Sequence, residues 1–113
     1  NNSISFSKDK GKMLENLVFL GLRQKFKHIF YFQEKKECDF VIKERDRIID
    51  AIQVCFDLNE ENKTREIHGL IDALKKFDLK KGFILTYNQN EDYFIENKNI
   101  LIRPVWKWLT GLD

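Results

Sequence analysis

The sequence contains few of the residues that break or cross-link a chain. Among 113 residues there are one proline, five glycines and two cysteines. So little proline and glycine, together with ten phenylalanines, excludes a disordered chain and indicates one packed domain. Both cysteines lie in strand-like runs, which predicts reduced thiols in a cytoplasmic protein and argues against a disulfide framework.

An excess of charge of one sign and long apolar runs are also missing. The 20 basic and 18 acidic residues leave a net charge of +2, so bulk electrostatics neither requires nor excludes a nucleic acid. No apolar run approaches the ~18 residues of a membrane-spanning helix, and we expect no membrane partner. A Gly-rich phosphate loop is absent too, so this chain by itself should not bind or hydrolyse ATP.

The hydrophobic pattern predicts an α/β fold in the order α-β-β-β-α-β-β-α, with helices packed on a mixed central β-sheet. Residues 1–10 are interpreted as a linker or lead-in, and residues 11–113 as a single domain cut from a longer polypeptide whose missing part lies upstream. The expected helices are 11–25, 64–77 and a short one after Pro104; the expected strands are 28–32, 37–43, 48–56, 82–87 and 100–103.

Several polar residues stand where the pattern predicts burial. Glu15 belongs to the apolar stripe of the first helix, and Asp39 and Gln53 interrupt the second and third strands. A hairpin with its turn centred on Asp46 would place Asp39 opposite Gln53 on one face of the sheet, with Cys55 two residues further along. If the first helix packs on that face, Glu15 reaches the same point, and oxygen ligands of this kind suit Mg²⁺ or Mn²⁺.

Plainer interpretations of these residues stay open. From the residues alone, the favoured interpretation is that Asp39 caps a backbone group or pairs with a buried arginine or lysine. Glu15 would then be a half-exposed helix residue that pairs with Arg23. Gln53 would satisfy a backbone group at a sheet edge, and Cys55 would be a small buried apolar residue.

Six segments in this order resemble the domain that follows the P-loop module in a large group of bacterial and archaeal AAA-type ATPases. They are ENLVFLGLR, ECDFVIKE, IQVCFDL, TREIHGLIDAL, KGFILTY and IRPVWKWL, and the resemblance covers roughly residues 11–110. That domain is similar in fold to the PD-(D/E)xK nucleases and Holliday-junction resolvases. The resemblance therefore implies a restriction-endonuclease-like fold.

The resemblance also implies roles for individual residues. Glu15 matches the helix acid, Asp39 the strand aspartate and Gln53 the first residue of the E/Q-x-K motif, which together would bind the metal and activate water. Cys55 stands where active enzymes have lysine, and loss of one such electrostatic group costs ~10²–10³ in rate. Arg65, at the start of the second long helix, is the candidate for a replacement cation.

The favoured function is consequently a degenerate nuclease fold that acts as an interaction or regulatory module on the upstream ATPase module or on nucleic acid. The alternative is an active Mg²⁺- or Mn²⁺-dependent nuclease of DNA or RNA that uses Glu15, Asp39 and Gln53. No cofactor is expected to be required for folding. Trp106 and Trp108 cannot both face inward on a regular final helix, so one of them is expected to be available to a partner.

Overall fold

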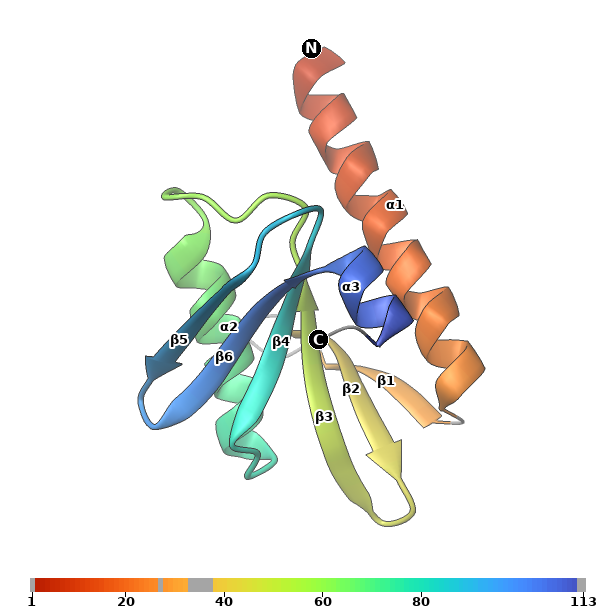
Figure 1. Cartoon of the computed structure of the whole chain (residues 1–113), viewed down its shortest axis with the longest axis vertical. Helices are drawn as coiled ribbons and strands as arrows, with labels where there is room; N and C mark the ends of the chain where they lie inside the picture. The colour runs from red at the N-terminus through yellow and green to blue at the C-terminus, as the bar shows by residue number, and fades with distance from the viewer. Residues whose placement is uncertain (1, 27, 33–37, 112–113) are drawn as a thin grey trace.

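The computed structural model describes residues 2–26, 28–32 and 38–111. Within them, six strands form one mixed sheet in the order β1-β2-β3-β4-β6-β5, with helices on both of its faces (Figure 1). The elements are α1 (Asn2–Lys25), β1 (His28–Phe32), β2 (Cys38–Glu44), β3 (Arg47–Val54), α2 (Lys63–Lys76), β4 (Lys81–Thr86), β5 (Glu91–Ile95), β6 (Lys98–Pro104) and α3 (Val105–Thr110).

The sheet combines an antiparallel meander with a parallel centre. Strands β1, β2 and β3 pair antiparallel in chain order. Helix α2 then crosses over, which a parallel connection requires, and β3, β4 and β6 pair parallel. Strand β5 pairs antiparallel with β6 at the far edge. The mixed α/β fold predicted from the sequence is therefore confirmed, and the structure supplies the strand order that the pattern leaves undetermined.

Two hydrophobic clusters hold the helices on the sheet. Helix α2 covers one face, where the cluster includes Ala51, Leu70, Leu74, Ile84 and Ile102. Helices α1 and α3 cover the other face, where it includes Val18, Leu22, Phe40, Ile52, Leu85 and Val105. The β4 residues 82–86 are all buried, as expected for a strand covered on both faces.

One predicted boundary is wrong, and one strand was not predicted. Helix α1 begins at Asn2 rather than at Gly11, so the expected lead-in is helical. Polar residues do not end a helix unless proline is among them, and a single glycine such as Gly11 costs a helix much less free energy than a proline would. The sequence also missed β5, because EDYFI lies among polar residues and has little apolar character of its own. Its strand conformation comes from pairing with β6.

Helix α1 buries a narrower face than the sequence predicts. Leu14, Val18 and Leu22 are buried, but Leu17 is 45% exposed, although the pattern places it beside the buried stripe. On the side of α1 next to α3, a Cβ atom at Gly21 would lie 2.3 Å from Cδ2 of Leu109, so glycine lets the two helices approach closely. Although α1 has 24 residues, none of the described helices is long and apolar enough to cross a membrane.

Candidate functional site

The β2–β3 hairpin brings Asp39 and Gln53 together through a compensated register. A two-residue turn at 45–46 closes the hairpin, and by itself it would place Asp39 opposite Ile52. A β-bulge adds Ile49 to one strand, so that Lys43 pairs with Ile48 but Ile42 pairs with Asp50. Continuing that shifted register places Asp39 beside Gln53. The turn is therefore not centred on Asp46 as predicted. The bulge supplies the one-residue shift that brings Asp39 to Gln53, and without it the two side chains would point to opposite faces.

Hydrogen bonds occupy both polar atoms of the Gln53 side chain. The Asp39 backbone N–H donates to Gln53 Oε1 at 3.1 Å, and Gln53 Nε2 donates to Glu66 Oε1 at 2.8 Å. The Val54 backbone N–H donates to Asp39 Oδ2 at 2.7 Å. Gln53 is only 4% exposed. Its side chain therefore links β2 to the first turn of α2, and its carbonyl oxygen points at a backbone donor.

Glu15 reaches Asp39 from α1. Glu15 was expected to reach the site if the first helix packed on the face of Gln53, but α1 packs on the opposite face of the sheet from α2 (Figure 1). Even so, the Glu15 carboxylate lies near enough to Asp39 for its negative charge to raise the pKa of that residue. The structure thus brings Glu15, Asp39 and Gln53 into one neighbourhood, with Asp39 in the middle.

This neighbourhood is electrostatically unfavourable for an ionised Asp39. The pKa of Asp39 is raised from 3.8 to about 7, chiefly by burial and also by the negative charges of Glu15 and Glu66, while the hydrogen bond from Val54 N–H opposes the rise. A negative charge close to a carboxyl group disfavours its ionised form and raises its pKa in this way. Perturbed carboxyl groups of this kind gather at functional sites, although structural networks also produce them.

Cys55 is a neutral thiol. Burial, followed by the charge of Glu66, raises the pKa of Cys55 to about 12. Its Sγ–H donates to the Asp57 carbonyl oxygen at 3.5 Å, and Asn62 Nδ2 donates to its sulfur at 3.6 Å. The environment thus disfavours the reactive thiolate. Cys55 carries no positive charge at the position where the resemblance places a lysine.

Arg65 contacts Glu66, which in turn accepts the hydrogen bond from Gln53. Its Nη2 is 3.4 Å from Glu66 Oε2, and the Arg65 side chain is 68% exposed whereas that of Glu66 is 14% exposed. So exposed an ion pair contributes little stability. Arg65 therefore approaches the site through Glu66 instead of touching Asp39 or Gln53 directly.

Sequence reasoning missed Glu66 and gave Lys10 no place in the site. A signal for Glu66 was available: it precedes the buried Leu70 by four residues, so both lie on the same face of α2. Lys10 fell in the expected linker, as one of several lysines that could touch a phosphate but are more often solvated. In the structure Lys10 Nζ lies 5.4 Å from the centroid of the Phe56 ring, and the Phe56 ring stacks on Tyr87 at 5.0 Å.

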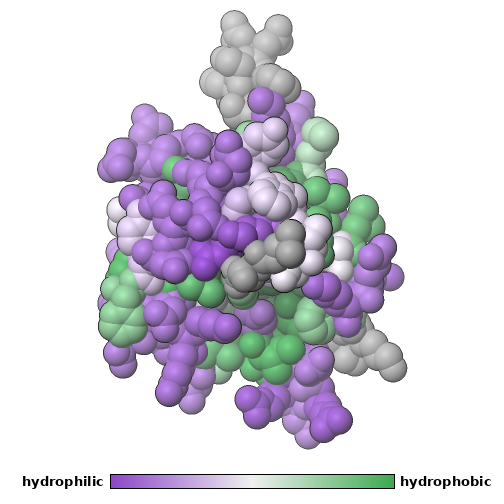
Figure 2. Space-filling view, in the orientation of Figure 1, coloured by the Kyte–Doolittle hydropathy of each residue, from purple (hydrophilic) through white to green (hydrophobic). Residues whose placement is uncertain are grey.

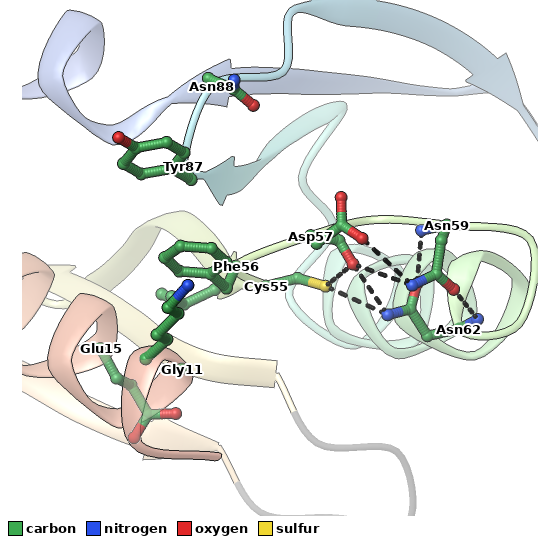
Figure 3. Close-up of a pocket in the computed structure, with 11 residues that line it drawn as sticks. Gly11, Glu15, Cys55, Phe56, Asp57, Asn59, Asn62, Tyr87 and Asn88 are labelled. Carbon is green, nitrogen blue, oxygen red and sulfur yellow. Dashed lines mark hydrogen bonds between the residues drawn. The ribbon is translucent and has the colours of Figure 1, made fainter. Parts of the chain in front are cut away.

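An open pocket of about 560 Å³ lies next to Glu15. It is bounded by α1, by the chain that follows β3, by the loop before α2 and by the residues after β4 (Figure 3). Its lining residues are Lys10, Gly11, Glu15, Val54, Cys55, Phe56, Asp57, Asn59, Asn62, Tyr87 and Asn88. The carboxyl ends of parallel strands β3 and β4 meet here, a frequent place for ligands in α/β sheets.

The donor set can be tested against a divalent metal ion. Over the described residues, no three histidine, cysteine, aspartate or glutamate side chains are arranged to hold one. The Glu15 and Asp39 carboxyls lie together and are chemically suitable for Mg²⁺ or Mn²⁺. However, Gln53 Oε1 already accepts the Asp39 N–H, and Asp39 Oδ2 accepts the Val54 N–H. Two carboxylates fit the metal, whereas the amide does not in this arrangement.

Comparison with known proteins identifies the family. Residues 10–108 match the family described as a domain of unknown function, DUF4143. The chain is also 44% identical, over 119 aligned residues, to the uncharacterized protein MJ1544 of Methanocaldococcus jannaschii. The match covers 96% of this chain and 26% of that relative, so the chain spans about a quarter of the length of the protein it resembles. The chain belongs to the DUF4143 family.

Proposed function

We propose that this domain is a PD-(D/E)xK-like fold without nuclease chemistry, and that it serves as an interaction or regulatory module of a longer cytoplasmic AAA-type ATPase. The observation that carries the proposal is the closed hydrogen-bond chain through Gln53. Both of its polar atoms are engaged, by Asp39 N–H and by Glu66 Oε1. The side chain that would complete a metal site instead ties β2, β3 and α2 together.

The chemistry of Cys55 supports the same proposal. A nuclease of this type needs a positive charge beside the attacking water and the phosphate, and a thiol whose pKa is about 12 supplies none. Arg65 is held at Glu66, so its guanidinium is already partly neutralised. A fold that keeps its acids and loses its cation retains a shape suited to binding.

The order of elements is compatible with the restriction-endonuclease-like fold. A helix precedes three antiparallel strands, and a crossover helix leads to a parallel central strand. The two acids come from the helix and the second strand, as the resemblance implies. Because fold does not determine activity, this agreement supports a common origin with the nuclease superfamily and leaves the present activity of the domain open to experiment.

A second candidate, a Mg²⁺- or Mn²⁺-dependent nuclease, is favoured by one observation. Glu15 lies near Asp39, whose pKa is raised, and it also lines the open pocket. Lys10 lines the same pocket. Glu15 and Asp39 would hold the ion, which would supply Lewis-acid activation of a phosphodiester of DNA or RNA. Lys10 would contribute the positive charge that Cys55 lacks.

One experiment separates the two candidates. The protein and its Asp39→Asn variant are incubated with Mg²⁺ or Mn²⁺ and with supercoiled plasmid, single-stranded DNA, branched DNA and RNA, while calorimetry measures metal binding. The introduced amide keeps an oxygen that accepts the Val54 N–H, so the variant should fold. We expect no cleavage and no saturable metal binding by either protein. Metal-dependent cleavage that disappears in the variant would establish the nuclease, and a Lys10→Gln variant would then test the proposed cation.

A further inference from the structure

Helix α1 has a second apolar stripe that the domain itself does not cover. Met13, Leu17 and Leu20 are 69%, 45% and 60% exposed, and their spacing of four and three residues is that of a coiled-coil seam. The buried stripe formed by Leu14, Val18 and Leu22 lies on a different side of the same helix. Helix α1 is thus apolar on two sides, and only one of them is packed.

The neighbouring helix extends this surface. Helix α3 approaches α1 at Gly21 and Leu109, and its Trp106 is 55% exposed whereas Trp108 packs into the core. Hydrophobic side chains gather along the course of α1 in Figure 2. An exposed tryptophan on the helix that packs against α1, together with the uncovered apolar stripe, has the composition of a protein-binding hot spot. The prediction that one of the two tryptophans is available to a partner agrees with this arrangement.

Charge identifies the kind of partner. Of the four exposed charged residues between positions 9 and 25, three are the cations Lys12, Arg23 and Lys25, and one is the anion Asp9. Two parallel copies of α1 would bring like charges together along the stripe, and in an antiparallel pair Lys12 would face Arg23 and Lys25, with Asp9 as the one exposed anion among these residues. A helix with an apolar seam and acidic flanks would pair with both features of this surface.

We propose that the exposed stripe of α1, together with Trp106, docks an acidic amphipathic helix. This proposal rests on the proposed function as an interaction module and specifies its surface. Such a helix could come from the rest of a longer polypeptide, since about three quarters of the relative lies outside the region shared with this chain. The seam is short, so the affinity should come from few apolar anchors and should depend on salt.

A synthetic probe tests the surface directly. The probe is a fluorescein-labelled helical peptide of three heptads with leucine at the a and d positions and glutamate at e and g. Two further peptides serve as controls, one with lysine in place of the glutamates and one with a scrambled sequence. Fluorescence anisotropy measures binding to the protein, to the double variant Leu17→Ser/Leu20→Ser, and to Phe94→Ser. Phe94 is a matched control because it is 66% exposed but lies on β5.

We expect the acidic peptide to bind more tightly than both control peptides. The leucine double variant should weaken binding about tenfold or more, as loss of a hot spot does, and Phe94→Ser should leave binding unchanged. Equal binding of the scrambled peptide, or equal binding by the leucine double variant, would overturn the proposal. So would stripe-dependent dimerisation in light scattering, or stripe-dependent binding to phosphatidylglycerol vesicles without peptide binding. None of these readouts depends on metal or on cleavage, so this proposal and the proposed function can fail separately.

Discussion

Replacing Asp39 by asparagine should stabilise the protein at pH 8. The folded environment raises the pKa of Asp39 from 3.8 to about 7, and each pKa unit corresponds to about 1.4 kcal/mol. Keeping Asp39 ionised in the folded state therefore costs roughly 4 kcal/mol, which relaxation and water penetration reduce to about 2 kcal/mol. The asparagine carries no charge, can accept the Val54 N–H and can donate to the Glu15 carboxylate.

The pH dependence has a defined sign. Between about pH 4 and pH 7 the folded state binds a proton at Asp39 that the unfolded state has released, so the stability of the parent protein falls as pH rises through this window. The advantage of Asp39→Asn should thus be absent below pH 4, grow up to about pH 7 and then stay constant. Denaturant unfolding at pH 5, 6.5 and 8, followed by tryptophan fluorescence, measures this advantage.

Asp50→Asn is the matched comparison. Burial, above all, raises the pKa of Asp50 to about 6, while the hydrogen bond from Ala51 N–H and the charge of Lys81 oppose the rise. Its advantage should be smaller and should reach its limit about one pH unit earlier. The reasoning is refuted if Asp39→Asn leaves the protein equally or less stable at pH 8, or if its effect does not change between pH 5 and pH 8.

Three further predictions concern packing, electrostatics and thiol reactivity. Gly82→Ala should destabilise the protein by about 1–3 kcal/mol, because the added Cβ would lie 2.9 Å from two leucine methyl groups and 3.2 Å from a carbonyl oxygen. Gly11→Ala should stabilise α1 by about 0.5–1 kcal/mol, because no atom lies within 4 Å of the added Cβ. Thermal unfolding of the two variants compares these effects. Glu66→Gln should lower the pKa of Asp39, because it removes a nearby negative charge, and a carboxyl-carbon NMR titration that found no decrease would contradict this. Cys55, whose pKa is about 12, should react with iodoacetamide at pH 8 on the order of a hundredfold more slowly in the folded protein than in urea, as peptide mapping would measure.

The hydrophobic pattern alone determined most elements of this protein. The period of 3.6 in α2 and the unbroken apolar run of β4 are local properties, and both elements lie where the sequence predicts. The pairing of Asp39 with Gln53 was also predictable, because a one-residue slip would move the buried side chains of a strand to the other face of the sheet. Periodicity could not foresee that the bulge at Ile49 would produce this register.

Only the tertiary structure decided what the polar residues do. Gln53 has two polar atoms, and whether they face a cation or a backbone N–H depends on where α2 places Glu66. The raised pKa of Asp39 likewise needs burial and two carboxylates from different helices, and no sequence spacing encodes that convergence. Strand β5 exists because β6 offers it an edge. Local sequence determines most helices and strands, since periodicity is a local property. Contacts between distant segments determine the pKa values and the hydrogen-bond partners of the polar side chains.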